Sequence, residues 1–189
     1  MVPFKRSIGM TMDGVKSSRY VYRGKVITVR IDELGNGKVR EVVEHRGSVA
    51  ILPLLDDGRV VLERQYRHVI GRELIEVPAG MVEEGESVEA AAQRELMEET
   101  GYRAGRLEYI GRCYMTPGYC NELIHFFIAS DLEKATGTSS MDEDEEIELL
   151  VISMDEAVEK VLANEIEDAK TLYALLRYMM LRSNGRYVS

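Results

Sequence analysis

Residues 80–102 read GMVEEGESVEAAAQRELMEETGY, and this stretch decides the fold more than any other part of the chain. Three of its glutamates, Glu95, Glu98 and Glu99, are spaced i, i+3 and i+4. On a helix this spacing places the three carboxylates on one face, where like charges repel one another. A cation is therefore expected among them, and a hard, oxygen-binding ion such as Mg²⁺ is the simplest candidate.

The same stretch predicts where its helix begins and ends. Ser87 suits the N-cap position, residues 88–100 contain no glycine or proline, and Gly101 suits a left-handed C-terminal stop. At about 100° per residue, the three glutamates fall in line with the apolar side chains, and Thr100 faces away. The apolar side chains of this arc are Val88, Ala91, Ala92 and Leu96. Because a solvated glutamate run would lie opposite the apolar arc, we expect these acids to be partly buried and to need a partner or a metal.

The fixed positions of this stretch resemble a complete Nudix box. They are Gly80, Glu86 and the run Arg94-Glu95-Leu96-Met97-Glu98-Glu99-Thr100-Gly101-Tyr102, with Tyr102 standing where a bulky aliphatic residue is usual. Nudix enzymes hydrolyse nucleoside diphosphates linked to another moiety, with a divalent metal held on the box helix. The resemblance implies that Glu95, Glu99 and the backbone carbonyl of Ala79 are metal ligands, and that Glu98 is a further ligand or a catalytic orienter of water. It also implies that Glu86 supports the site and that Arg94 is a structural ion-pair partner.

Outside the box, roughly residues 38–180 resemble the ADP-ribose pyrophosphatase subfamily. The resembling segments are Val42–Ala50, Arg64-Gln65-Tyr66-Arg67, Glu76-Val77-Pro78-Ala79-Gly80 and Thr116-Pro117-Gly118-Tyr119-Cys120-Asn121-Glu122. Pro117 follows the last box glycine at the distance usually associated with ADP-ribose preference. The usual Ser-Pro-Gly-Phe is here Thr-Pro-Gly-Tyr, and Cys120-Asn121 replaces the more usual Thr-Asp. The resemblance therefore implies ADP-ribose as the substrate.

Substrate contacts are predicted partly from charge. A pyrophosphate carries negative charge that arginine forks can grip, and Arg67 is the first choice, with Arg64 second. Arg64 could equally be a solvated strand residue. Adenine could stack on Tyr119, or between aromatic residues of the N-terminal strands such as Tyr20 and Tyr22. The expected substrate-binding set is Arg67, Arg64, Glu83, Thr116, Pro117, Gly118, Glu122 and Tyr20.

A second acidic run, Asp142–Glu146, precedes a strand candidate at residues 147–152. Taken alone, such a run indicates an exposed loop. In the resembled enzymes the loop here closes over the pyrophosphate and presents a catalytic glutamate, and Glu143 matches best by position, followed by Glu145. A base on a flexible loop would reach the attacking water only when substrate is bound.

Composition limits the classes of protein to which the chain can belong. The chain has 189 residues, 45% apolar and 30% charged, which is enough for a sizeable core. A net charge of −9 argues against nucleic-acid and membrane-surface binding. Cys113 and Cys120 form no CxxC pattern and are expected to be ordinary thiols in a reducing cytoplasm. The sequence shows no signal peptide and no apolar run of membrane-spanning length.

Strand and helix signals follow one another along the whole chain. Strands are predicted at 20–22, 26–32, 39–45, 49–55, 60–66, 74–77, 107–114, 123–129 and 147–152, and helices at 88–100, 154–162 and about 169–182. This is an α+β pattern with a mixed β-sheet, in agreement with the α/β/α sandwich that the Nudix resemblance implies. Residues 1–45 are expected to form an antiparallel strand region for dimerisation and substrate contact, and residues 46–189 the Nudix domain.

Three functions are therefore considered. The favoured one is Mg²⁺-dependent hydrolysis of ADP-ribose to AMP and ribose 5-phosphate, with Mn²⁺ as an alternative metal. A pyrophosphatase for another nucleoside diphosphate sugar or dinucleotide would share the box and the arginines. A non-catalytic ADP-ribose sensor would usually lack box glutamates, and this chain keeps all of them. Because the resembled enzymes are homodimers that exchange N-terminal strands, a homodimer is also expected.

Overall fold

The computed structural model describes residues 14–135 and 147–185, so the catalytic candidates Glu143 and Glu145 lie outside the described residues. The described chain falls into two compact units. The strand unit comprises residues 14–45 together with Thr116–Glu122, and the main unit comprises residues 46–115, 123–135 and 147–185. The segment Thr116–Glu122, which carries the predicted Pro117 loop, thus groups with the N-terminal strands.

The strand unit is an antiparallel sheet in the order β1-β2-β3. Its strands are β1 (Val15–Arg23), β2 (Thr28–Leu34) and β3 (Val39–Glu44). The glycine-containing turn after β2 closes with a hydrogen bond from the Leu34 N–H to the Lys38 carbonyl, 2.8 Å long. All residues of β1 are exposed within this chain. The N-terminal antiparallel strand region expected from the sequence is therefore present.

The main unit contains two sheets, of four and three strands. Their strands are β4 (Ser48–Pro53), β5 (Val60–Arg67), β6 (Arg72–Glu76), β7 (Ala79–Met81), β8 (Tyr102–Tyr114), β9 (Leu123–Lys134) and β10 (Ile147–Ile152). The orders are β7-β4-β9-β8 and β10-β5-β6. Strands β4 and β9 run parallel, and the other pairs of neighbouring strands are antiparallel, so the predicted mixed sheet is confirmed.

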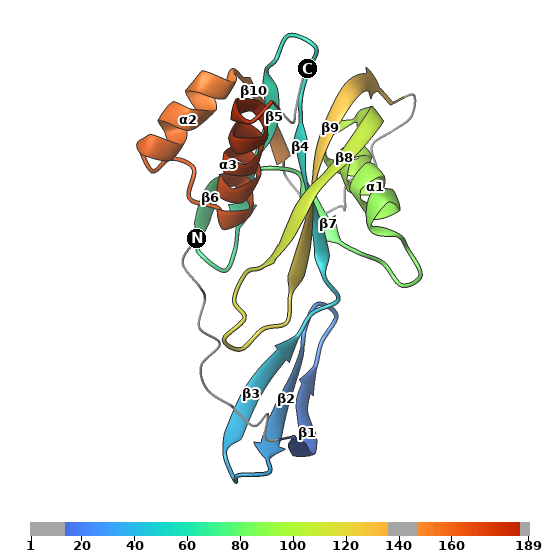
Figure 1. The fold of residues 1–189 in the computed structure, drawn as a ribbon, viewed down its shortest axis with the longest axis vertical. Coiled ribbons are helices and arrows are strands. Elements are labelled where there is room, and N and C mark those ends of the chain that lie inside the picture. The colour runs from blue at the N-terminus through green and yellow to red at the C-terminus, as the bar shows by residue number, and fades with distance from the viewer. Residues whose placement is uncertain (1–13, 136–146, 186–189) are drawn as a thin grey trace. The chain divides into compact units, whose positions relative to one another are not determined.

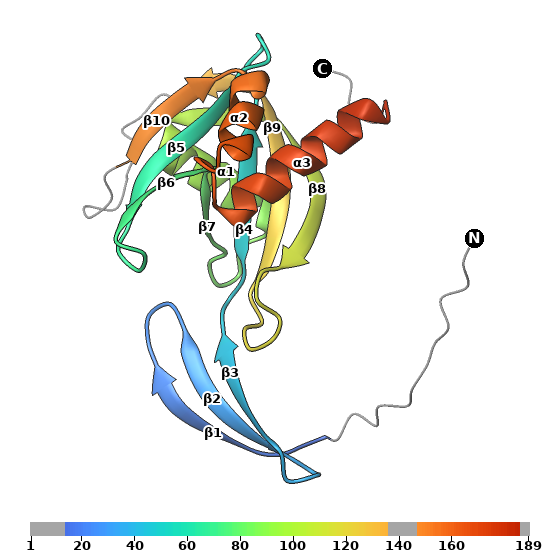
Figure 2. The same cartoon turned by 90° about the vertical axis from the view of Figure 1, so that its left-hand side faces the viewer.

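Helices cover both faces of the four-stranded sheet, as Figures 1 and 2 show. Helix α1 (Val88–Thr100) lies on one face, α3 (Ala169–Ser183) lies on the other, and α2 (Met154–Leu162) lies beside α3. Each face has its own core, because alternate residues of a strand point to opposite sides. Ile51 of β4 packs in the core beneath α1, whereas Leu52 packs in the core that includes α3 residues. This arrangement confirms the α/β/α sandwich.

Some strands are longer than predicted, since β1 begins at Val15 and β8 at Tyr102. Two further differences concern the box. Thr100 does not face away from the apolar arc, because it is only 7% exposed and its hydroxyl donates a hydrogen bond to the Leu96 carbonyl. Thr100 lies one turn beyond Leu96, so it extends the buried arc at its far edge. Strand β7 was not predicted separately, and it carries Gly80, the first glycine of the box. Within residues 14–135 and 147–185, no helix combines the length and apolar character that crossing a membrane requires.

Candidate active site

Helix α1 is held at both ends by the residues that the sequence predicts. The Ser87 hydroxyl accepts a hydrogen bond from the Ala90 N–H at 3.1 Å, which satisfies one of the free donors of the first turn. Gly101 adopts φ of 69°, in the left-handed region that favours glycine, and its N–H donates to the Met97 carbonyl at 3.0 Å. These two caps fix the register of the helix and therefore the face on which its glutamates lie.

Arg94 lies at the centre of the box glutamates. Its guanidinium donates to Glu86 through Nε and Nη2, both at 3.0 Å, and through Nη1 to Glu95 at 2.7 Å and Glu98 at 3.0 Å. Its Nη2 also donates to the Met81 carbonyl at 2.9 Å, which ties the helix to β7. The predicted ion-pair role of Arg94 is confirmed. Three carboxylates thus share one guanidinium, and this box cluster (Glu86, Arg94, Glu95, Glu98) carries an excess of negative charge.

The box glutamates are also partly buried, as their alignment with the apolar arc predicts. Glu95 is only 9% exposed, and Glu98 and Glu99 are half-buried. The hydrogen bonds from Arg94 lower the pKa of Glu86 below its ordinary value, and the same carboxylates raise the pKa of Arg94. The Glu86 carboxylate is therefore charged at neutral pH and is held by the Arg94 guanidinium.

Strand β7 brings backbone groups up to these carboxylates. The Ala79 N–H donates to Glu99 Oε2 at 2.8 Å, so the residue predicted to offer a carbonyl ligand lies beside a predicted carboxylate ligand. A Cβ atom built on Gly80 would lie 2.1 Å from the carboxylate carbon of Glu95. A side chain at position 80 would therefore have to displace the Glu95 carboxylate, which occupies this space.

The donor set fits a hard divalent cation. Carboxylate and backbone carbonyl oxygens are the ligands that Mg²⁺ and Mn²⁺ prefer, and Glu95, Glu98 and Glu99 share the helix face next to Ala79. Among the residues that the structure describes, no three acidic, histidine or cysteine side chains already converge as metal ligands. Glu95 and Glu98 instead accept hydrogen bonds from Arg94, and Glu99 accepts one from the Ala79 N–H. Metal binding would therefore exchange these contacts for oxygen–metal bonds.

Arg67, the first-choice phosphate ligand, lies at the end of β5 and forms a two-point ion pair with Glu76. Its Nε donates to Glu76 Oε1 at 2.8 Å, and its Nη2 donates to Oε2 at 2.6 Å. Burial of Glu76, which is 2% exposed, would raise the pKa of its carboxyl. The hydrogen bonds and charges of Arg67 and Lys170 outweigh burial, so that the pKa of Glu76 lies below its ordinary value.

The second predicted arginine and the predicted acid before the box have simpler surroundings. Arg64 lies opposite Glu148 in the β5–β10 ladder, and their side chains form an exposed ion pair at 3.6 Å. Such an exposed pair contributes little to stability, which agrees with the alternative interpretation of Arg64 as a solvated strand residue. Glu83 is exposed, and its backbone N–H donates to Glu86 Oε2 at 3.1 Å. The structure thus connects Glu83 to the box through its backbone.

The other predicted substrate residues lie in the strand unit. Thr116, Pro117 and Gly118 belong to the segment that pairs with β3, where the Val43 N–H donates to the Tyr119 carbonyl at 2.7 Å. Asn121, which replaces the usual aspartate, accepts from the His45 N–H at 2.8 Å, and Glu122 lies 3.6 Å from the His45 ring nitrogen. The Asn121 side chain therefore has a structural role in holding this segment beside the end of β3.

The aromatic candidates for adenine stacking are exposed in the strand unit. Tyr119 is exposed, and Tyr20 and Tyr22 are exposed on β1. The guanidinium carbon of Arg23 lies 4.1 Å from the centre of the Tyr20 ring, so a cation–π contact covers one face of that ring. An adenine on Tyr20 would have to use the opposite face or displace Arg23.

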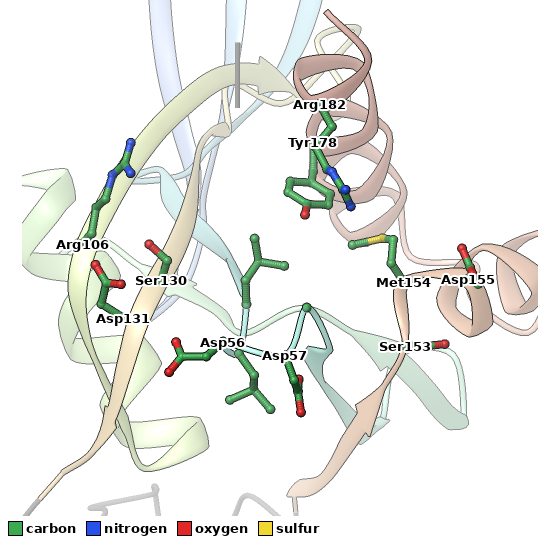
Figure 3. A pocket seen from close by; sticks show the side chains of 13 residues that line it. Asp56, Asp57, Arg106, Ser130, Asp131, Ser153, Met154, Asp155, Tyr178 and Arg182 are labelled. Atoms are coloured by element: carbon green, nitrogen blue, oxygen red, sulfur yellow. The ribbon is translucent and has the colours of Figure 1, made fainter. Parts of the chain in front are cut away.

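A cavity of about 600 Å³ lies elsewhere in the main unit, as Figure 3 shows. Its lining includes Asp56 and Asp57, from the turn after β4, and Tyr178 and Arg182, from α3. Gly80 pairs with Val49 near the start of β4, whereas this cavity lies past the end of that strand. None of the predicted site residues lines it, so the cavity and the predicted site lie at different ends of β4.

Sequence reasoning did not find Glu76 and Lys170 as parts of the site region. Lys170 Nζ, on α3, donates to Glu76 Oε2 at 3.1 Å, across 94 residues of sequence. The available signal for Glu76 was local: an acid in the otherwise apolar run Leu74–Val77 must be exposed or paired. No sequence pattern indicates Lys170, because its partner comes from a different element.

Comparison with known proteins places the chain among hydrolases of nucleotide derivatives. A model of the NUDIX domain matches residues 44–176. An ADP-ribose pyrophosphatase of Bacillus subtilis (strain 168) is 40% identical over 166 residues, which are 86% of this chain and 89% of that protein. A GDP-mannose pyrophosphatase of Salmonella arizonae is 42% identical over 158 residues, covering 76% and 81% of the two chains. The crystal structure of an ADP compounds hydrolase superimposes with a TM-score of 0.80 at 25% identity, covering 96% of this chain and all of that one.

Proposed function

The chain belongs to the Nudix family and is a hydrolase, and from that premise we propose that it cleaves the pyrophosphate bond of ADP-ribose to give AMP and ribose 5-phosphate. The observation that carries the proposal is the gathering of three carboxylates, those of Glu86, Glu95 and Glu98, around the guanidinium of Arg94. Such an arrangement calls for an external cation. The similarity to an ADP-ribose pyrophosphatase supports the substrate.

Nudix hydrolases generally need a divalent metal, and we propose Mg²⁺ for this chain, with Mn²⁺ as the alternative. Glu95, Glu99, Glu98 and the Ala79 carbonyl would hold it. When bound, the metal neutralises phosphate oxygens and lowers the pKa of a coordinated water. The carboxylates supply the negative charge that holds the divalent metal beside an anionic substrate.

The remaining catalytic and binding tasks are assigned to the other predicted site residues. Arg67 grips the diphosphate, and Arg64 adds a second contact. Glu98 orients the attacking water, and Glu143 or Glu145 removes its proton. Thr116, Pro117, Gly118 and Glu122 hold the nucleoside or ribose end, with Glu83 and Tyr20 completing the set. These assignments follow the resemblance and the charge of the substrate.

A second candidate substrate class is the nucleoside diphosphate sugars. The relative named GDP-mannose pyrophosphatase is as similar in identity as the ADP-ribose pyrophosphatase, although over a smaller share of the chain. Both substrates carry the same diphosphate, so the box and Arg67 serve either one. The difference must come from residues that contact the base and the sugar.

A substrate panel tests the proposal. Purified protein is incubated with ADP-ribose, GDP-mannose and a diadenosine polyphosphate, each with Mg²⁺, with Mn²⁺ and with EDTA, and released nucleotide monophosphates are separated by chromatography. We expect AMP from ADP-ribose at the highest kcat/KM and no product with EDTA. A higher kcat/KM for GDP-mannose would move the assignment to the second class. Binding of ADP-ribose without any product would identify a sensor instead of an enzyme.

We also propose that the protein is a homodimer. Every residue of β1 is exposed in the single chain, including the apolar side chains of Val15 and Val21. An edge strand of this kind needs a cover to avoid uncontrolled pairing. Light scattering at micromolar concentration should give twice the mass of the chain, and a monomeric mass would refute the proposal.

A further inference from the structure

The main unit contains a buried group of charges outside the Nudix box. This Glu76 cluster consists of Arg67 on β5, Glu76 at the end of β6, Asp168 at the N-cap of α3, and Lys170 in its first turn. Glu76 is 2% exposed, and its carboxylate accepts hydrogen bonds from both cations. Its Oε1 accepts from Arg67 Nε, and its Oε2 accepts from Arg67 Nη2 and from Lys170 Nζ. Arg67 is thus held by a carboxylate that also accepts a hydrogen bond from Lys170.

Helix α3 fixes the second cation. Lys170 Nζ donates to Asp168 Oδ1 at 2.7 Å, and Asp168 Oδ2 accepts from both the N–H and the hydroxyl of Thr171, at 2.9 and 2.8 Å. The Thr171 hydroxyl also accepts from the Val77 N–H at 2.8 Å. Because Val77 follows Glu76 directly, the start of α3 is bound to the same stretch of backbone that carries the carboxylate. Lys170 therefore has little freedom to leave Glu76.

The formal charges explain why a second cation is needed. Glu63 lies directly opposite Glu76 in the β5–β6 ladder and is also 2% exposed. Glu76 and Asp168 contribute two formal negative charges, against two positive charges from Arg67 and Lys170. Removal of Lys170 would leave Arg67 as the one cation of the Glu76 cluster beside the carboxylates of Glu76 and Asp168. The excess negative charge would bind the guanidinium more strongly and would repel an approaching diphosphate.

We propose that Lys170 is a positioning residue that acts through Glu76 to hold Arg67 in the orientation that grips the substrate diphosphate. The inference rests on the proposed function, because it takes Arg67 as a phosphate contact. It adds a residue of α3 to the determinants of substrate affinity. The direction of the Glu76 pKa, which lies below its ordinary value despite burial, agrees with two cations acting on this carboxylate.

The first test compares three lysine variants with ADP-ribose as the substrate. Lys170→Met removes the charge and keeps the apolar stem, and we expect KM to rise about tenfold while kcat changes by less than about threefold. Lys170→Arg keeps a cation and should restore KM to within about threefold of the wild type. Lys134→Met is the matched control, because Lys134 is exposed at the end of β9 and outside this cluster, and its KM should not change. Circular dichroism and Mn²⁺ binding must stay normal in all three.

A double-mutant cycle then identifies the route of the effect. If Lys170 acts through Glu76, Lys170→Met should change KM by less than about twofold in a Glu76→Gln background, whereas independent effects would multiply. An unchanged KM in Lys170→Met, no rescue by Lys170→Arg, or a multiplicative double mutant would each overturn the proposal. Arg67→Met is measured beside them. An unchanged KM in Arg67→Met would instead show that Arg67 does not grip the diphosphate, which is a failure of the proposed function.

Discussion

The box cluster and the Glu76 cluster both hold carboxylates partly away from water, but they pair these carboxylates with cations in different ways. In the box cluster, one guanidinium serves Glu86, Glu95 and Glu98. In the Glu76 cluster, two cations on different elements serve Glu76, and Asp168 balances the second of them. Both lie partly out of water, where unbalanced charge is costly. The first cluster is left short of positive charge, and the second is nearly balanced by the chain itself.

This difference indicates what each cluster is for. A cluster that lacks positive charge gains stability when a cation binds, so it can bind a metal and, through the metal, an anionic substrate. A nearly balanced cluster gains nothing from an added ion, and instead it fixes the direction of the groups that form it. Variants that alter one cluster should therefore change metal binding, and variants that alter the other should change substrate affinity.

The largest expected effect comes from removing a carboxylate on the metal side. Glu99→Gln should lower kcat by at least about a hundredfold with folding intact, because the amide is neutral and a poorer ligand for a hard cation. The Mn²⁺ affinity, measured by titration, should fall with it. Glu89→Gln, an exposed position on the same helix, is the matched control and should keep both values. Near wild-type turnover in Glu99→Gln would count against the metal assignment.

A smaller effect on metal affinity is expected from the substitution of Gly80, which lies against the Glu95 carboxylate. In Gly80→Ala the new methyl group would overlap the Glu95 carboxylate, which is the flexible end of its side chain and can be pushed aside. We expect Mn²⁺ affinity to fall about tenfold, and the melting temperature to change little, because displacement of a charged ligand is worth about 1–2 kcal/mol. Gly14→Ala, where the added methyl group meets no atom within 4 Å, is the control. An unchanged metal affinity in Gly80→Ala would show that Glu95 does not need its present position.

The box cluster is the part of the site that could be predicted from the sequence. Its residues lie within one helix and the turn before it, so the spacing of Glu95, Glu98 and Glu99 already defines their common face. The caps at Ser87 and Gly101 are equally local. The error at Thr100 has the same origin, because the width of the buried arc depends on what packs against the helix, and periodicity alone does not contain that information.

The Glu76 cluster could not be predicted, because it depends on contacts between distant elements. The sequence indicated Arg67 by resemblance and by the charge of the substrate, but its partner Glu76 comes from the next strand and Lys170 from the last helix. The grouping of Thr116–Glu122 with β3 is a similar case, since the backbone hydrogen bonds of Val43 reach Tyr119 and Asn121, far along the chain. Local patterns predict which residues can do chemistry, and tertiary pairing determines which neighbours orient them.

A third variant tests how strongly the stability of the fold depends on Arg94 in the box cluster. Arg94→Met leaves three carboxylates without their shared cation, so the free energy of unfolding in EDTA should fall by about 2 kcal/mol. Added Mg²⁺ should restore part of the loss, because the ion supplies the missing positive charge. Arg106→Met removes an exposed pair with Glu108 and should cost about 0.5 kcal/mol or less, independently of Mg²⁺. A stability loss that Mg²⁺ leaves unchanged would contradict the view that metal and arginine share one cluster.

The smallest effect concerns the pH dependence of stability. Hydrogen bonds from Arg94 hold the pKa of Glu86 in the folded protein below its ordinary value of 4.5. Since the folded pKa is the lower one, this pair stabilises the fold at pH values above 4.5, and its contribution is lost as the pH falls through the folded pKa. Glu86→Gln should therefore flatten the fall in melting temperature below pH 4.5, and Arg94→Met should flatten it similarly, because each removes one partner. If both variants kept the wild-type slope, the acid sensitivity would have to come from other carboxylates, with the Glu76 cluster the next to test.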